Sequence, residues 1–136
     1  MAQSLGLPSD RLLLLTDRPL PVVQRALRQA AAGLHTMWNE HFGISVVEMQ
    51  AAALLPVAND SGGPRSDIVQ PGRTGYLATS PEQYAACLLQ LLEARELYPQ
   101  RLRRMQRLAM RSARRFCDEA FAARWAHEAT LLLQGL

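Results

Sequence analysis

The chain of 136 residues contains no lysine, so all 15 of its basic residues are arginines. Arginine is therefore the only permanently charged basic side chain that could neutralise a bound phosphate. Cysteine is also scarce, because only Cys87 and Cys117 occur, without a CxxC pair or a zinc-ligand spacing. This excludes a disulfide-rich scaffold and predicts two buried or partly buried thiols in a reducing compartment.

Long apolar runs are missing as well. The leucine run Leu12–Leu15 is far shorter than the ~20 apolar residues that a transmembrane helix needs, and no signal peptide is visible. The net charge of +3 is modest, and neither a zinc finger nor an aromatic-interleaved RNA motif accompanies it. We therefore expect no nucleic-acid partner. The length and the 49% hydrophobic content suit one modest core.

Short apolar segments alternate with helix-forming and glycine-rich segments in the first 80 residues. We expect strands at 12–15, 33–38, 55–59 and 74–78, a loop at 39–43, a helix at 44–53 and a glycine turn at 60–64. This order predicts an α/β fold with a partial doubly wound, Rossmann-like parallel sheet. Ligands bind such sheets outside the carboxyl ends of the strands, so the loop at 39–43 and the turn at 60–64 should converge on one rim. Asp67 is expected to brace that rim.

The last third of the chain has helical periodicity. We expect helices at 81–93 and 99–116, and a last helix that Asp118 caps and that extends to Leu133. The core-facing stripe of the second helix comprises Leu102, Met105, Leu108 or Ala109, Ser112 and Phe116; one side of the last helix presents Phe121, Trp125, Ala129 and Leu132. Nine arginines fall between Arg95 and Arg124, and the simplest interpretation is a solvated helical face.

Glu40 and Glu48 stand eight positions apart around a glycine turn. Because helical side chains lean toward the N-terminus of their helix, the Glu48 carboxylate can reach toward the edge that carries Glu40. The same edge has the unpaired N–H groups of the first helical turn, near Gly43, where a phosphate or sugar hydroxyl fits. An ionised Glu48 can accept two hydrogen bonds from a ribose. The spacing alone favours two solvated acids, because short motifs often match by chance.

Three nearby side chains have two interpretations each. His35 is either hydrogen-bonded scaffolding or a catalytic group, and His41 is either scaffolding or a residue that perturbs the adjacent Glu40. Trp38 either packs or forms a wall for a sugar or base. No metal site is expected, because no second ligand stands at a metal-binding spacing.

A set of motifs is shared with a known family: Glu40-x7-Glu48 with the internal Phe42-Gly43, then Ala51-Ala52 and Asn59-Asp-Ser-Gly-Gly-Pro64. This set resembles the donor-binding region of the retaining family-4 glycosyltransferases of the GT-B fold. Within that family, the strings at 33–44, 61–64, 67–69 and 74–78 are most similar to the GDP-mannose-dependent α-1,2-mannosyltransferases that extend a dolichol-linked oligosaccharide.

The resemblance implies a role for each motif residue. Glu40 would lie beside the transferred sugar as the catalytic residue, and Glu48 would bind the ribose. Gly43 and Ile44 would offer backbone N–H groups to the sugar or diphosphate, and Gly62–Gly63 would line the same cleft. The reaction keeps the anomeric configuration and requires no metal cofactor. The implied partners are GDP-mannose, a dolichyl-diphosphate oligosaccharide and the endoplasmic reticulum membrane at its cytosolic face. The expected membrane contact is either the missing N-terminal part or the basic helices, whose arginines could also bind lipid head groups or dolichol diphosphate.

The chain matches only the C-terminal half of a GT-B fold. We expect residues 1–80 to form an incomplete donor-binding domain and residues 81–136 to form helices that pack on it. Met1–Arg11 resembles the end of a helix with a glycine stop, as in an interior sequence, so we expect a fragment that is inactive alone. The alternatives are a non-catalytic nucleotide-sugar-binding or assembly module that partners a separate membrane subunit, and a gene fragment without function.

Two positions depart from the family pattern. Ala53 stands where the family has a glycine that ends the motif helix, and an alanine in a left-handed conformation would cost about 1 kcal/mol or more. The basic residues that neutralise the departing diphosphate in the family have no counterpart here. Arg18 and Arg65 are the only candidates near the rim, and neither is assigned.

Overall fold

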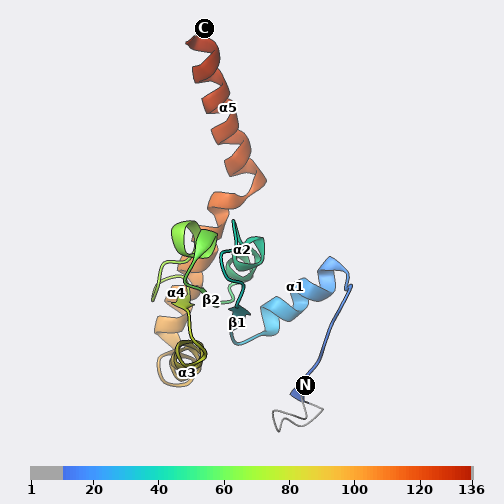
Figure 1. Cartoon of the computed structure of the whole chain (residues 1–136), viewed down its shortest axis with the longest axis vertical. Helices are drawn as coiled ribbons and strands as arrows, with labels where there is room; N and C mark the ends of the chain where they lie inside the picture. Colours follow the sequence, from blue (N-terminus) through green and yellow to red (C-terminus); the bar gives the residue numbers. More distant parts are fainter. Residues whose placement is uncertain (1–10, 136) are drawn as a thin grey trace.

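The computed structural model describes residues 11–135 and contains a small parallel sheet (Figure 1). The three strands are β1 (Gly33–His35), β2 (Pro56–Asn59) and β3 (Tyr76–Ala78), and they pair in the order β1-β2-β3. Leu34 pairs with Val57, which in turn pairs with Tyr76. Three of the four expected strands and the α/β fold are therefore confirmed. The helix end expected within Met1–Asp10 lies outside the described residues.

The fourth expected strand, Leu12–Leu15, is wrong. This segment has irregular backbone, and Leu13 and Leu14 are 78% and 79% exposed. A strand is stable only when a neighbour pairs its backbone groups and covers its side chains. Within the described residues, no strand pairs with this segment, so leucine content alone does not make it part of the sheet.

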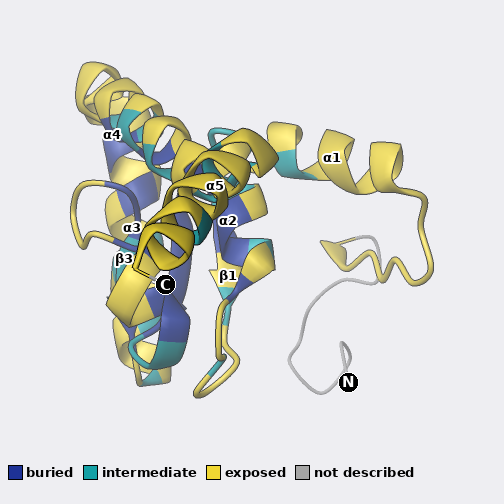
Figure 2. Ribbon diagram, turned by 90° about the horizontal axis from the view of Figure 1, so that it is seen from above, coloured by how far each residue is buried: buried dark blue, intermediate teal, exposed yellow. Residues whose placement is uncertain are grey.

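Helix α1 (Leu20–Gln29) follows this segment and was not expected from the sequence. It begins after Pro19, with Pro21 in its first turn, where the missing proline N–H costs no helical hydrogen bond. None of its residues is buried, and the helix extends away from the sheet (Figures 1 and 2).

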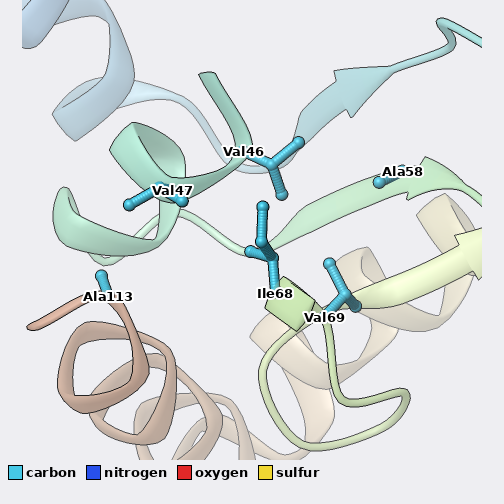
Figure 3. Close-up of a cluster of buried hydrophobic side chains, with 6 residues drawn as sticks. All are labelled: Val46, Val47, Ala58, Ile68, Val69 and Ala113. Carbon is cyan, nitrogen blue, oxygen red and sulfur yellow. The ribbon is translucent and has the colours of Figure 1, made fainter. Parts of the chain in front are cut away.

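Helix α2 (Ile44–Ala51) packs against β1 and β2 and contacts α4 (Pro99–Ala113). Between the sheet and these helices lies the cluster shown in Figure 3, which comprises Val46, Val47, Ala58, Ile68, Val69 and Ala113. Ile68 ends a short π-helical turn, η3 (Pro64–Ile68). Residues 62–68 are thus helical, so the expected glycine turn at 60–64 ends sooner than predicted.

A buried glutamine ties α2 to the segments after β2. Gln50 is fully buried, and its Nε2 donates to the Thr74 carbonyl at 3.1 Å and to the Ile68 carbonyl at 3.4 Å. A buried amide is tolerated only when it finds such partners. These bonds fix α2, and with it Glu48, relative to the loop that enters β3.

The C-terminal end of α2 closes on Ala53, whose φ is +61°. The Leu54 N–H donates to the Met49 carbonyl at 2.9 Å, and the Ala53 N–H donates to the Gln50 carbonyl at 3.0 Å. This is the paired hydrogen bonding of a Schellman motif, which places its left-handed residue at the position of Ala53. The expected strain of an alanine in a left-handed conformation is therefore present.

Helix α3 (Pro81–Leu97) packs against β3 and covers the second cluster, in which Leu55, Val57, Ala78, Leu91, Met105 and Ala109 are buried. It begins with a capping box in which Ser80 and Gln83 bond each other's backbone. The helix extends four residues beyond the expected end at Glu93. Cys87 and Cys117 are both partly buried, as expected, and burial raises the pKa of the Cys87 thiol.

The stripe expected on 99–116 is confirmed at Met105 and Ala109, which are buried, while Leu102, Ser112 and Phe116 are partly buried. Ala113, which was not expected in the stripe, is buried as well. The helix continues into the 3-10 turn η4 (Arg114–Phe116). All nine arginines from Arg95 to Arg124 are exposed, which confirms the interpretation as a solvated face within this chain, and Arg115 also donates hydrogen bonds to Asp67 and Ser112.

The last helix, α5 (Asp118–Gln134), projects from the body of the molecule (Figure 1). Cys117 is its N-cap and Asp118 its first residue, without a side-chain capping bond, so the expected Asp118 cap is wrong. None of its residues is buried, and Phe121 and Trp125 stack on each other while remaining about two-thirds exposed (68% and 67%). The side of Phe121 and Trp125 has no core to face within the described chain.

The division of the chain at residue 80 stays a prediction.

Candidate functional site

The carboxyl end of β1 delivers Glu40 to the rim of the sheet. The strand ends at His35, and the chain continues through an irregular loop to Gly43. The His35 Nε2 lies 3.9 Å from the Glu40 Oε2, and the two side chains are 11% and 27% exposed. His35 Nδ1 is buried and has no hydrogen-bond partner among the described residues. Glu40 is thus a partly exposed carboxylate with a histidine beside it.

The expected convergence of the two loops on one rim is confirmed. The Gly63 N–H donates to the Glu40 carbonyl at 2.8 Å. The Asn39 N–H donates to the Ser61 hydroxyl at 2.8 Å, and that hydroxyl donates to Asn59 Oδ1 at 2.7 Å. The loop after β1 is therefore bonded directly to the start of the segment after β2.

Glycine is required where these loops touch. A Cβ on Gly62 would collide with the Glu40 carbonyl, and Gly62 also has a φ of +52°. A Cβ on Gly63 would come within 2.6 Å of the His41 carbonyl. Both glycines therefore allow close backbone packing. Their predicted role in lining a ligand cleft stays a prediction, and the Gly63 N–H is already used by Glu40.

Gly43 is the N-cap residue of α2, with a φ of +97° that favours glycine. It is buried, while Ile44 is 59% exposed. Among the described residues, the N–H groups of Gly43 and Ile44 have no hydrogen-bond partner. Their predicted role in binding an anion or a sugar hydroxyl, at the positive end of the helix dipole, stays a prediction.

Glu48 lies in the middle of α2 and is exposed. It lines a groove of about 190 Å³ between α1 and α2, together with Leu20, Val23, Gln24, Leu27, Arg28, Ala51 and Ala52. Its carboxylate makes no hydrogen bond or ion pair to any described side chain. The groove exists only because α1 lies beside α2, which the sequence analysis did not anticipate. Whether Glu48 binds a ribose stays a prediction.

The remaining predicted residues lie on the exposed part of the loop. Trp38 is 76% exposed, so its interpretation as a packing residue is wrong within the described chain, because nothing covers its ring. His41 is exposed as well. Both stay predicted site-lining residues. The described part of the chain contains no cluster of three or more His, Cys, Asp or Glu side chains able to hold a metal.

Sequence reasoning missed the side chains that hold this rim from a distance. The Tyr84 hydroxyl of α3 donates to the His35 carbonyl at 3.2 Å, and burial raises the pKa of that hydroxyl, although a hydrogen bond with Asn59 opposes the change. Asp67, expected to brace the rim, accepts a 2.7 Å hydrogen bond at its carbonyl from Arg115 Nη2. No local signal links these pairs, which are 49 and 48 positions apart.

A comparison with family models identifies the class of protein to which the chain belongs. Residues 1–108 match the family model described as glycosyl transferases group 1, and the chain belongs to that family. The parallel sheet with its C-terminal helices corresponds to part of the C-terminal half of a GT-B fold.

Several relatives share one particular name within the family. The chain is 41% identical over 118 residues to the GDP-Man:Man(3)GlcNAc(2)-PP-Dol alpha-1,2-mannosyltransferase of Dictyostelium discoideum, a match that covers 87% of this chain and 20% of the relative. The proteins of the same name from Neurospora crassa and Homo sapiens are 43% and 42% identical, over 88% and 76% of this chain and 21% of each relative. The chain thus spans about a fifth of the length of these curated relatives.

Proposed function

We propose that this chain is the donor-binding part of a retaining α-1,2-mannosyltransferase. It would act with GDP-mannose as donor and a dolichyl-diphosphate-linked oligosaccharide as acceptor. One observation carries the proposal: the loop with Glu40 and the segment with Gly63 are hydrogen-bonded to each other at the carboxyl ends of adjacent parallel strands. That is where α/β sheets bind nucleotides. The names of the relatives supply the donor and the acceptor.

The donor would lie across the start of α2. The free N–H groups of Gly43 and Ile44 suit the diphosphate or a hydroxyl of mannose, because the first helical turn concentrates positive partial charge. Glu48, which lies four residues after Ile44 in the same helix, would accept hydrogen bonds from the ribose hydroxyls. Trp38 and His41 are exposed on the loop beside Glu40 and would border the sugar.

The chemistry assigned to Glu40 is electrostatic. The bond between the anomeric carbon and the diphosphate oxygen breaks, and GDP leaves with the electron pair. The acceptor hydroxyl then bonds to the same face of the anomeric carbon, and its proton passes to the departing diphosphate oxygen. Positive charge builds up on the sugar between these events, so a carboxylate beside it stabilises the transition state. Glu40 is suitable for this because its carboxylate is partly exposed on a backbone that is hydrogen-bonded to Gly63.

Charge on the departing diphosphate needs a further partner. Arg65 is close to the rim, but its Nε lies 3.5 Å from Asp60 Oδ1 and its side chain is 66% exposed. We assign the neutralising role to neither Arg65 nor Arg18. Our proposal treats transfer as metal-independent, so chelation of divalent ions with EDTA should leave donor binding unchanged.

The proposed location is the cytosolic face of the endoplasmic reticulum membrane, where a dolichol-linked acceptor is embedded. None of the described helices is long and apolar enough to cross a membrane. The exposed arginines of α4 would then face anionic head groups or the acceptor diphosphate.

Calorimetry of the purified chain tests the donor site. We expect GDP-mannose and GDP to bind, and UDP-glucose to bind at least about tenfold more weakly, which is a difference of about 1.4 kcal/mol. Glu48→Ala should weaken binding of GDP-mannose and GDP alike, because its proposed ribose contact is present in both. Glu40→Gln should weaken GDP-mannose binding more than GDP binding, since Glu40 is assigned to the sugar.

The matched control is Glu96→Ala, which removes an exposed carboxylate from α3, outside the rim. Circular dichroism establishes that each variant is folded. A folded wild-type chain that binds neither GDP nor GDP-mannose would overturn the proposed donor site. Equal loss of binding in Glu48→Ala and Glu96→Ala would mean that the Glu48 effect comes from the change in net charge and not from a contact with the ribose.

A further inference from the structure

The turn between α4 and α5 contacts the loop that carries Glu40. The rings of Phe116 and Phe42 meet edge to face, with centroids 5.3 Å apart and an interplanar angle of 75°. This is a favourable geometry for two aromatic rings. Phe42 lies two residues after Glu40 and directly before Gly43. A residue 74 positions later in the chain therefore touches the segment between the proposed catalytic carboxylate and the proposed anion-binding helix.

Phe116 is itself held in place by its neighbour. The Arg115 guanidinium lies 4.9 Å from the centroid of the Phe116 ring. Its Nη2 donates to the Asp67 carbonyl at 2.7 Å and to Ser112 Oγ at 3.0 Å, while its Nε donates to the Ser112 carbonyl at 3.2 Å. Arg115 thus joins η4 to η3. Among the exposed arginines of this region, it is the one with these three hydrogen bonds, so it has a role beyond solvation.

Few hydrogen bonds and packing contacts hold the rest of the Glu40 loop in place. Most residues from Thr36 to Phe42 are exposed, and the loop backbone is bonded to the neighbouring segment through the Asn39 N–H and the Glu40 carbonyl. Phe42 extends from the same loop toward Phe116, which packs on the buried cluster around Val46 and Ile68. Segments with few buried contacts open locally at low free-energy cost, so one aromatic contact is a large share of what holds this loop.

We propose that Phe116 is a positioning residue for Glu40, which it acts on through Phe42, and that Arg115 holds Phe116 in the required place. The Phe42–Phe116 contact keeps the loop closed on the Gly63 backbone, so that the Glu40 carboxylate keeps its position at the rim. The consequence for mannose binding rests on the proposed function; the control of the loop position does not.

Amide hydrogen exchange, measured by NMR on the whole chain, tests this proposal directly. The amides of Asn39 and Gly63 report the loop, because each is bonded across it, and the amide of Ala58, buried in the central strand, reports the body. In Phe116→Leu, which keeps an apolar side chain but removes the ring, we expect Asn39 and Gly63 to exchange roughly three- to tenfold faster relative to Ala58. Arg115→Ala should produce a smaller increase at the same two amides.

Two matched variants complete the experiment. Phe116→Tyr keeps the ring and should leave all three exchange rates unchanged. Phe121→Leu makes the same chemical change as Phe116→Leu but in α5, on a ring that is 68% exposed, and should also have no effect. Phe116→Leu should weaken GDP-mannose binding by a similar three- to tenfold factor and GDP binding less, because the loop carries the residue assigned to the sugar.

The outcomes separate the two proposals. Unchanged exchange at Asn39 and Gly63 in Phe116→Leu would overturn the positioning role, as would an equal increase at Ala58, which would make Phe116 a general stabilising residue. If the wild-type chain binds no donor, the proposed function fails for this chain, but the exchange rates still decide whether Phe116 positions the loop.

Discussion

Helices α1 and α4 have similar amphipathic sequences but lie in different environments. Both are strongly amphipathic, and both combine arginines with apolar residues. Helix α4 contacts α2 and α3 and buries Met105, Ala109 and Ala113, whereas α1 buries none of its residues (Figure 2). An amphipathic pattern therefore specifies which side of a helix is apolar, but burial depends on whether other elements stand opposite that side.

The same contrast separates the body from α5. The body consists of the sheet with α2, α3 and α4, and it contains both buried clusters. Helix α5 has 17 residues, of which none is buried. Short helices in water are only marginally stable without tertiary packing, so most of the stability of this chain should come from the body. Substitutions in α1 or α5 should therefore change the free energy of unfolding only slightly.

The largest expected effect comes from truncating equivalent apolar side chains in the two amphipathic helices. Met105→Ala in α4, where the side chain is 4% exposed, should lower the free energy of unfolding by about 2–5 kcal/mol. Leu20→Ala in α1, where the side chain is 59% exposed, should change it by less than about 0.5 kcal/mol. Urea unfolding followed by circular dichroism measures both. Similar losses in the two variants would contradict the contrast between the helices.

A second test places a methyl group at the contact between the two loops. In Gly63→Ala, the new Cβ meets backbone oxygen atoms that cannot move like a side chain, so we expect a loss of about 1–3 kcal/mol in unfolding free energy together with weaker GDP-mannose binding. Gly135→Ala is the control near the C-terminal end, because its Cβ would have no neighbour closer than 3.6 Å. Equal stability of the two variants would mean that the loops do not touch in solution.

A smaller effect, of opposite sign, is expected at the end of α2. Ala53→Gly should raise the unfolding free energy by about 1 kcal/mol, because glycine adopts the observed φ of +61° without strain. Ala51→Gly, at the last residue of α2, should lower it by about 0.5–1 kcal/mol. Urea denaturation of the two variants and the wild-type chain measures both changes in unfolding free energy. A loss of stability in Ala53→Gly would exclude the left-handed conformation at residue 53.

The smallest effect is expected in α5. Trp125→Ala removes the largest kind of apolar side chain, yet it should change the unfolding free energy by less than about 0.5 kcal/mol, because the ring is 67% exposed. A buried tryptophan would cost about 3–5 kcal/mol. Thermal unfolding followed by circular dichroism avoids the loss of the fluorescent probe. A cost of several kcal/mol would mean that α5 packs against the body.

The correct sequence-based predictions share a local cause. The strand before Glu40, the strand before Asn59 and the core stripe of 99–116 each follow from a periodic apolar pattern. The convergence of the two loops follows from a general property of parallel sheets, which collect the ends of successive strands at one edge. The strain at Ala53 follows from the comparison with a family that has glycine there.

The wrong predictions share a different cause. Leu12–Leu15 has the composition of a strand but no strand beside it in the described chain, and Trp38 has the composition of a packing residue but no covering element. Asp118 has the right side chain for a cap but stands one residue inside the helix. In each case, the residue type suits a structural role, but the neighbouring elements that the role requires are not in place.

The amino-acid sequence by itself determined where the chain forms strands and helices in the body, which sides of them are apolar, and that Glu40 and Gly63 follow strands whose ends meet at one rim. Those properties depend on backbone preferences and on spacings of a few residues. Only the tertiary structure decided that Phe116 touches Phe42, that Tyr84 bonds the His35 carbonyl, and that α4 is buried while α1 and α5 are not. These depend on distances between elements far apart in the chain, which no local pattern encodes.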